Sequence, residues 1–117
     1  MRPRSTPPPE PTDPQGFTQR GNRFSRNAAY EQAIQDYSRA IELDQGFAEA
    51  YFHRGVSFFE LRRYDEAIGD LTQAIALKPT DDSAYSRRAL AYLLTDRLEL
   101  AQADEEKCEE LRGGSPG

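Results

Sequence analysis

The sequence predicts an all-α fold, a right-handed α-solenoid of three helix–turn–helix repeats with six helices. Three observations predict it. Residues of the same kind recur every 34 positions, the apolar residues inside each interval follow the spacing of one helix and then of a second, and turn signals separate these segments.

The repeat is visible in small, aromatic and charged residues alike. Gly21 and Gly55 are 34 residues apart, and Ala33, Ala67 and Ala101 take that step twice. The other matching triplets are Phe17, Tyr51 and Tyr85; Phe24, Phe58 and Tyr92; Tyr30, Tyr64 and Leu98; Leu43, Leu77 and Leu111; Arg20, Arg54 and Arg88; and Asp36, Asp70 and Asp104. So many positions in register exclude an accident of composition.

The first repeat is expected to form helices near residues 15–27 and 30–43. Asp13-Pro14 marks the start of the first one, because aspartate caps helix N-termini and proline suits the first helical position.

The second repeat predicts helices near 48–61 and 64–77, joined by the polar turn Arg62-Arg63. Their apolar residues fall at i, i+3, i+4 and i+7, which is the spacing of one helix face. The sequence Lys78-Pro79-Thr80-Asp81 then ends the segment, and helices near 82–94 and 98–111 complete the third repeat.

Outside the repeats, the head and the tail have little apolar character. We therefore divide the chain into a proline-rich, disordered arm at 1–13, a repeat domain at 14–112 (repeats 14–47, 48–81 and 82–112) and a flexible tail at 113–117. The arm contains one PxxP match, so a role as a ligand for SH3 or WW domains stays open beside that of a plain tail.

Composition excludes several classes of function. The net charge of −5 argues against a dedicated nucleic-acid binder, and a mean hydropathy of −0.84 argues against a membrane protein. One cysteine cannot form an internal disulfide, and one histidine cannot seed a metal cluster. No nucleophile–base pair or phosphate loop is found, so we expect no enzyme and no cofactor. The N-terminus shows no apolar segment of a secretory signal, so we expect a cytoplasmic protein.

The second copy, with Tyr51, Gly55, Phe58, Ala67 and Pro79, resembles the tetratricopeptide repeat, in which two helices cross closely at small residues. The other copies depart from this pattern. Arginine replaces the family's leucine before the glycine slot in all three, Gln45 replaces the closing proline of the first, and Ala89 and Glu105 replace the glycine and the large apolar residue of the third.

The resemblance implies a concave groove lined by the first helix of each repeat, and a protein or peptide partner bound there. The groove residues that we expect to contact the partner are Thr18, Asn22, Phe52, His53, Val56, Phe59, Arg87 and Leu90. We expect apolar anchoring on Phe52, Val56 and Leu90, whereas Phe59, Leu93 and Leu94 are open between groove and core. The predicted function is therefore an adaptor or co-chaperone-like module that is a monomer, with a self-associating structural subunit as the alternative.

A narrower mode of this family is the carboxylate clamp, which grips the free C-terminus of a chaperone. Asn22 and Arg87 match the clamp, but Thr18, His53 and Ser83 stand where lysine, asparagine and lysine belong. Without both lysines, we do not expect a clamp.

Two further expectations concern stacking. Each arginine of the Arg20, Arg54, Arg88 series precedes an aspartate by 16 residues, which predicts one ion pair within each repeat. In the last helix, Glu105 and Glu106 fall where a fourth repeat would pack, whereas Leu98, Leu100, Ala101 and Cys108 are expected to face the preceding helices. The array should therefore end at three repeats with no large apolar end left open.

Overall fold

The computed structural model describes residues 9–113, which form six helices and contain no strand. The helices are α1 (Pro14–Arg26), α2 (Tyr30–Leu43), α3 (Ala48–Glu60), α4 (Tyr64–Leu77), α5 (Asp82–Leu94) and α6 (Leu98–Leu111). These bounds agree with the predicted ones to within one residue. Residues 1–8 of the arm and 114–117 of the tail lie outside the described part of the chain.

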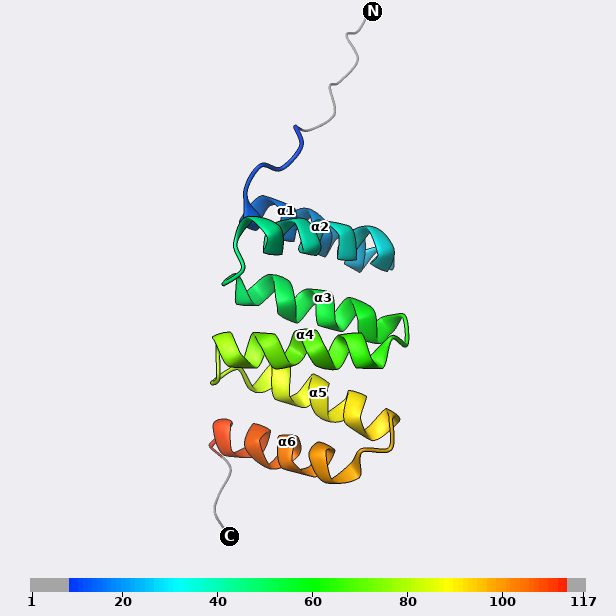
Figure 1. The fold of residues 1–117 in the computed structure, drawn as a ribbon, viewed down its shortest axis with the longest axis vertical. Coiled ribbons are helices and arrows are strands. Elements are labelled where there is room, and N and C mark those ends of the chain that lie inside the picture. Colours follow the sequence, from blue (N-terminus) through cyan, green and yellow to red (C-terminus); the bar gives the residue numbers. More distant parts are fainter. Residues whose placement is uncertain (1–8, 114–117) are drawn as a thin grey trace, which may run out of the picture.

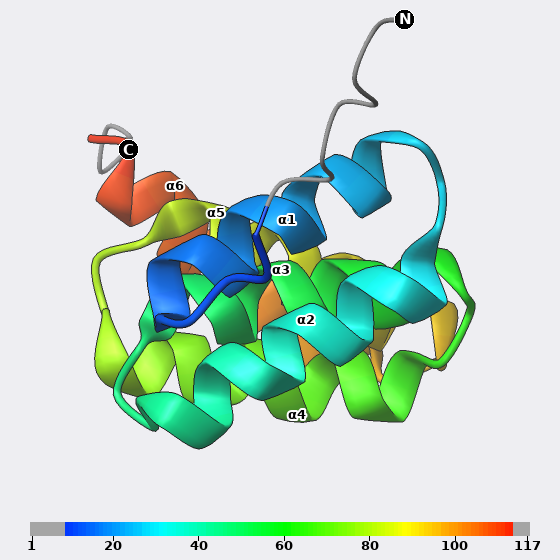
Figure 2. The same cartoon turned by 90° about the horizontal axis from the view of Figure 1, so that it is seen from above.

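The helices stack in chain order as three hairpins (Figures 1 and 2). Contacts join α1 to α2, α3 to α4 and α5 to α6, and the hairpins meet through α2 with α3 and α4 with α5. The first helices also touch one another, α1 with α3 and α3 with α5, whereas α2, α4 and α6 make no mutual contact. The stack therefore curves with α1, α3 and α5 on its inner side, and we call their exposed surface the inner face.

Each hairpin turns through a left-handed residue that is not glycine. Ala28, Arg62 and Asp96 have φ of 58°, 62° and 61° and are themselves 34 residues apart. The amide after each of them donates to a carbonyl five residues back, over 2.8–2.9 Å, which closes the preceding helix. The sequence predicts a polar turn at Arg62-Arg63 and does not predict the backbone conformation of any of the three turns, because no glycine marks it.

The two helices of a hairpin approach each other closely at the glycine slot. A Cβ atom placed on Gly21 would lie 2.7 Å from Cε1 of Tyr37, and one on Gly55 would lie 3.0 Å from Cγ of Leu71. Tyr37 and Leu71 are almost completely buried. In each pair, a large side chain of the second helix fills the space that the missing side chain of the first helix leaves.

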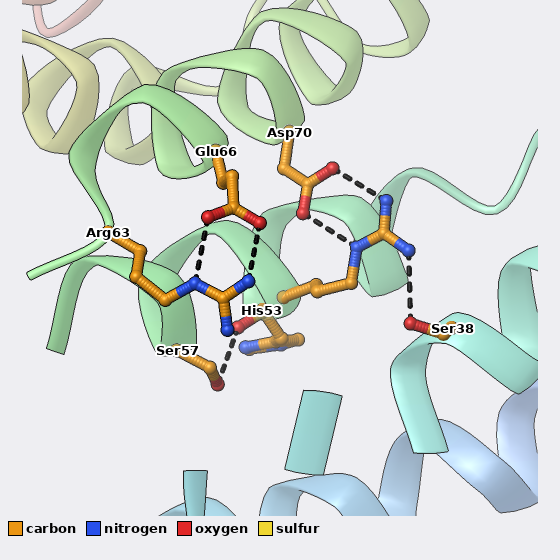
Figure 3. Close-up of polar contacts among 7 residues, drawn as sticks. Ser38, His53, Ser57, Arg63, Glu66 and Asp70 are labelled. Atoms are coloured by element: carbon orange, nitrogen blue, oxygen red, sulfur yellow. Dashed lines mark hydrogen bonds and ion pairs between the residues drawn. The ribbon is translucent and has the colours of Figure 1, made fainter. Parts of the chain in front are cut away.

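The three predicted ion pairs are present, and they are bidentate (Figure 3 shows the middle one at Asp70). In each repeat, Nε and Nη2 of the arginine donate to the two carboxylate oxygens of the aspartate over 2.7–2.8 Å. The aspartates are buried rather than exposed. The hydrogen bonds that Arg54 donates to Asp70 raise the pKa of Arg54 above its ordinary value.

The same arginines also connect one repeat to the preceding one. Nη1 of Arg54 donates to the Ser38 hydroxyl over 3.1 Å, and Nη1 of Arg88 donates to the Thr72 hydroxyl over 3.1 Å. Each guanidinium therefore fixes the second helix of its own repeat and the second helix of the repeat before it.

The last helix agrees only in part with the predicted cap. Glu105 and Glu106 are exposed, and Ala101 and Cys108 are buried, as expected. The prediction for Leu98 and Leu100 is wrong, since they are 56% and 51% exposed. The same slot holds Gln32 and Glu66 in the other repeats, and both are exposed. The slot of Leu100 therefore does not face the core in any repeat. Apolar surface is consequently left open near this end, and Leu90, Leu93 and Leu94 of α5 add to it.

The buried ion pair of the second repeat should contribute more stability than its exposed neighbour. Asp70→Asn removes a carboxylate that holds a half-buried guanidinium, so we expect it to lower the free energy of unfolding by about 1–3 kcal/mol. Glu66→Gln removes the carboxylate of an equally bidentate but exposed pair with Arg63, so we expect no measurable change (Figure 3). Urea unfolding measures both, and equal effects would contradict this account.

The glycine slot should tolerate no side chain in the first repeat. Gly21→Ala forces the buried ring of Tyr37 to move, and we expect a loss of about 1–3 kcal/mol in the free energy of unfolding. Gly69→Ala is the matched control, because a Cβ there meets no atom within 4 Å inside helix α4. That control should gain about 0.5–1 kcal/mol from helix propensity. Thermal or urea unfolding that finds Gly21→Ala more stable than Gly69→Ala would refute the close approach.

Candidate functional site

The inner face carries a run of partly exposed apolar side chains from α3 and α5. Phe52, Val56 and Phe59 are half-buried, and Leu90 is 43% exposed. The ring edge of Phe59 packs against Tyr64, with centroids 5.4 Å apart, whereas Leu93 and Leu94 are 47% and 56% exposed. The two leucines that the sequence left open are therefore exposed to solvent, and Phe59 is shared between the surface and the hairpin.

Thr18 does not line this surface. It is 1% exposed, and its hydroxyl donates to the carbonyl of Pro14 in the same helix over 2.8 Å. The expectation that it contacts a partner is wrong, because the side chain is buried and its hydroxyl is already bonded within its own helix.

Asn22, Tyr37 and His53 form a polar cluster where α1, α2 and α3 meet. The Tyr37 hydroxyl donates to Oδ1 of Asn22 over 2.6 Å, and the His53 ring stacks on the Tyr37 ring with centroids 5.8 Å apart. Burial raises the pKa of Tyr37 to about 12, so this hydroxyl stays protonated and keeps its hydrogen bond. The amide nitrogen of Asn22 donates to none of residues 9–113 and is available to a ligand.

His53 is neutral at neutral pH. Its ring lies between Tyr37 and the edge of Phe52, whose centroid is 5.2 Å away. Burial lowers the pKa of His53 from 6.5, and this effect exceeds the opposite influence of Glu49 and Asp81. His53 therefore offers a ligand a hydrogen bond rather than a positive charge.

Arg87 lies near one carboxylate and one aromatic ring. Nη1 lies 4.0 Å from Oε1 of Glu60, and the guanidinium carbon lies 6.0 Å from the centre of the Phe59 ring. Of the two clamp-like residues, Asn22 is thus held by Tyr37 and Arg87 lies near an acidic neighbour.

A pocket of about 290 Å³ opens beside His53, between α3 and the connection from α4 to α5. Its lining includes Phe52 and His53, which the sequence predicts, and three charged residues that it does not predict: Glu49, Lys78 and Asp81. Glu49 precedes His53 by four residues on one helix, so it could have been found from spacing. Lys78 and Asp81 come from the connection between repeats and could not.

The chemistry available here is that of recognition. Within residues 9–113, no group of histidine, cysteine and carboxylate side chains is placed to hold a metal ion, and no helix has the length and apolar character to cross a membrane. The inner face offers apolar contact, one free amide donor, a neutral imidazole and a guanidinium. This combination suits a peptide main chain together with an apolar side chain.

Two protein-family models match the sequence of this chain. A family model described as TPR repeat matches residues 21–62, and one described as Tetratricopeptide repeat matches residues 48–81. No curated protein sequence matches the chain.

Several solved structures are similar over most of the chain. The second TPR of Spaghetti (RPAP3) bound to HSP90 peptide SRMEEVD is 33% identical, with a TM-score of 0.82 and coverage of 84% of this chain and 91% of the other. The second TPR domain of human RPAP3 with HSP70 peptide SGPTIEEVD is 32% identical, with a TM-score of 0.81 and coverage of 88% and 89%. MamA is 25% identical, with a TM-score of 0.84 and coverage of 87% and 60%.

These matches agree with the structure, which shows 34-residue helical hairpins that cross closely at Gly21 and Gly55. The chain belongs to the tetratricopeptide repeat family.

Proposed function

We propose that this chain is a non-catalytic protein–protein interaction module that binds a peptide or helix segment of a partner on its inner face. The observation that carries the proposal is the row of accessible apolar side chains, Phe52, Val56 and Leu90, beside the pocket at His53. Support also comes from similar TPR domains whose structures hold short peptides.

The partner binds through an apolar side chain rather than through an acidic C-terminus. The peptides in the two RPAP3 structures both end in EEVD. A negative end of this kind needs unpaired positive charge, but here Thr18 is buried, His53 is neutral and Arg87 lies near Glu60. Glu49 and Asp81 place two negative charges beside the pocket, against the single positive charge of Lys78. An uncharged or basic segment with one large apolar residue fits this surface better.

Polar groups set the register of that segment. The free amide of Asn22 and the imidazole of His53 can hydrogen-bond to peptide carbonyl and amide groups, while the apolar residue lies against Phe52 and Val56. A short peptide covers less than a standard protein interface of about 1,600 Å², so binding is reversible and of moderate strength.

Peptide display against the full chain should select sequences with a large apolar residue and no acidic end. Binding of a selected peptide, followed by fluorescence anisotropy, should weaken about tenfold or more in Phe52→Ser and in Val56→Asn, because each substitution removes buried apolar area. Both replacements occur naturally in the same slots of this chain, at Ser86 and Asn22, so the fold should persist.

Leu100→Ser is the matched control, since it removes an exposed leucine away from the inner face and should leave binding unchanged. The peptide SRMEEVD should compete poorly. Selection of acidic C-termini, or binding that survives both inner-face substitutions, would overturn the proposed mode.

His53 gives a direct measure of the site, because it is the only histidine and its ring signals in NMR are unambiguous. We expect a pKa below 6.5 in the folded protein, since burial disfavours the imidazolium. The unfolded chain then takes up the proton first, so stability present above pH 6.5 is lost as the pH falls towards the folded pKa. Glu49→Gln should lower the pKa further, and a value at or above 6.5 would show that the ring is not buried as described.

A further inference from the structure

The two ends of the stack have complementary surfaces. At the C-terminal end, a pocket of about 500 Å³ lies between α5 and α6, and its lining includes Ala89, Leu90, Glu105, Glu106 and Glu109. In the earlier repeats, the equivalent place against each hairpin is taken by the first helix of the next repeat. Among the described helices, α6 contacts only α5, and this face of α6 is open in Figure 1. We call it the C-terminal seat.

In the C-terminal seat, carboxylates stand in slots that hold apolar residues in the first two repeats. Glu105 occupies the slot of Tyr37 and Leu71, which are buried within their repeats. Glu109 occupies the slot of Ile41 and Ile75, and Glu106 that of Ser38 and Thr72. Glu105 and Glu109 are exposed and form no hydrogen bond or ion pair within residues 9–113. Arg112 does not neutralise them, because it donates to Asp82 over 2.6 Å.

One slot on the outer side of α1 holds a basic residue, whereas the same slot holds a small residue in the later repeats. Ser57 and Ala91 are completely buried in repeats that have a predecessor, but the same slot of the first repeat holds Arg23, which is exposed. Arg23 forms no ion pair within the described residues. The face that would meet a preceding repeat therefore carries one unpaired positive charge, that of Arg23, and the C-terminal seat carries negative charge. The arm lies on the same face through Glu10 and Pro11, so a docking copy must displace it.

Arg20 shows how the two faces would join. In the later repeats, Nη1 of the arginine donates to Ser38 or Thr72 of the preceding repeat. Within residues 9–113 no repeat precedes Arg20, and its Nη1 donates instead to Glu10 of the arm over 3.1 Å, a side chain that is 80% exposed. On the C-terminal seat, the slot of Ser38 and Thr72 holds Glu106, so a carboxylate stands where this guanidinium needs its acceptor.

From these observations we infer that a second copy of this chain docks head to tail, with α1 of one copy in the C-terminal seat of the other. Arg20 exchanges Glu10 for Glu106 of the neighbouring copy, and Arg23 meets Glu105 and Glu109. A head-to-tail contact uses two different faces, so each docked copy still presents one free face to a further copy. Because α1 here takes the place of the next repeat in the stack, copies are added in a row. The inner face then continues from α5 of one copy to α1 of the next.

Sedimentation equilibrium of the full chain tests this interface. Between about 10 µM and about 1 mM, the range of weak association, the average mass of the natural protein should rise above 13.2 kDa and fall back with added salt. The double variant Glu105→Lys, Glu109→Lys and the single variant Arg23→Glu should each remain at 13.2 kDa, because each places like charges across the junction. Mixing the two variants should restore association.

Two further variants sharpen the test. Glu99→Lys with Glu110→Lys makes the same charge change at exposed positions of α6 outside the C-terminal seat, and it should associate like the natural protein. Glu10→Gln should strengthen association, since it weakens the bond that Arg20 must give up. Circular dichroism confirms that each variant is folded.

The inference is overturned if the natural protein stays at 13.2 kDa throughout, if the two double variants behave alike, or if mixing restores nothing. It is also overturned if the chain stays monomeric but binds an added arginine-rich helical peptide through Glu105 and Glu109, because the seat then belongs to another protein. None of these results depends on peptide binding by the inner face.

Discussion

A helical hairpin of this chain has an apolar side that only another hairpin can cover, and the rest of the structure depends on that constraint. Within a hairpin, Gly21 or Gly55 lets a large side chain of the second helix reach the first. Between hairpins, Ala50 and Ala84 are completely buried in the joints. Stacking in one dimension leaves four kinds of exposed surface: the two ends of the stack, its inner face and its outer face. Binding surfaces must lie on one of them.

The bidentate arginine–aspartate pairs determine how the hairpins are aligned. Apolar contact is non-directional and would tolerate small rotations of one helix against another. A planar guanidinium that meets Asp70 with two nitrogens and Ser38 with the third does not tolerate them. Arg88 makes the same three contacts with Asp104 and Thr72, so both joints between hairpins are aligned in the same way. This alignment keeps α1, α3 and α5 on one side of the stack, the side that carries Asn22, His53 and Arg87.

The 34-residue register was sufficient to predict the helices, the crossings and the ion pairs, because each of these depends on one slot repeated three times. The sequence could not predict features set by neighbouring slots. Thr18 shares a slot with Phe52 and Ser86, but its size and its bond to Pro14 bury it. Leu98 and Leu100 look like core residues by type, yet they lie on exposed positions of α6. The left-handed turns at Ala28 and its equivalents carry no glycine to announce them.

Comparing one slot across the three repeats separates residues that serve stacking from residues that can bind a partner. A slot that is buried and similar in all repeats serves packing, as at Ala33, Ala67 and Ala101. The slot of Asn22, Val56 and Leu90 differs in each repeat and stays accessible, so stacking places no demand on it. The end slots follow a third rule: Arg23 in the first repeat and Glu105 and Glu109 in the third differ in character from the same slots of the other repeats, and their charges are opposite. Solubility alone would be served by charge of either sign. Opposite signs at Arg23 and Glu105 additionally make each end a fit for the other.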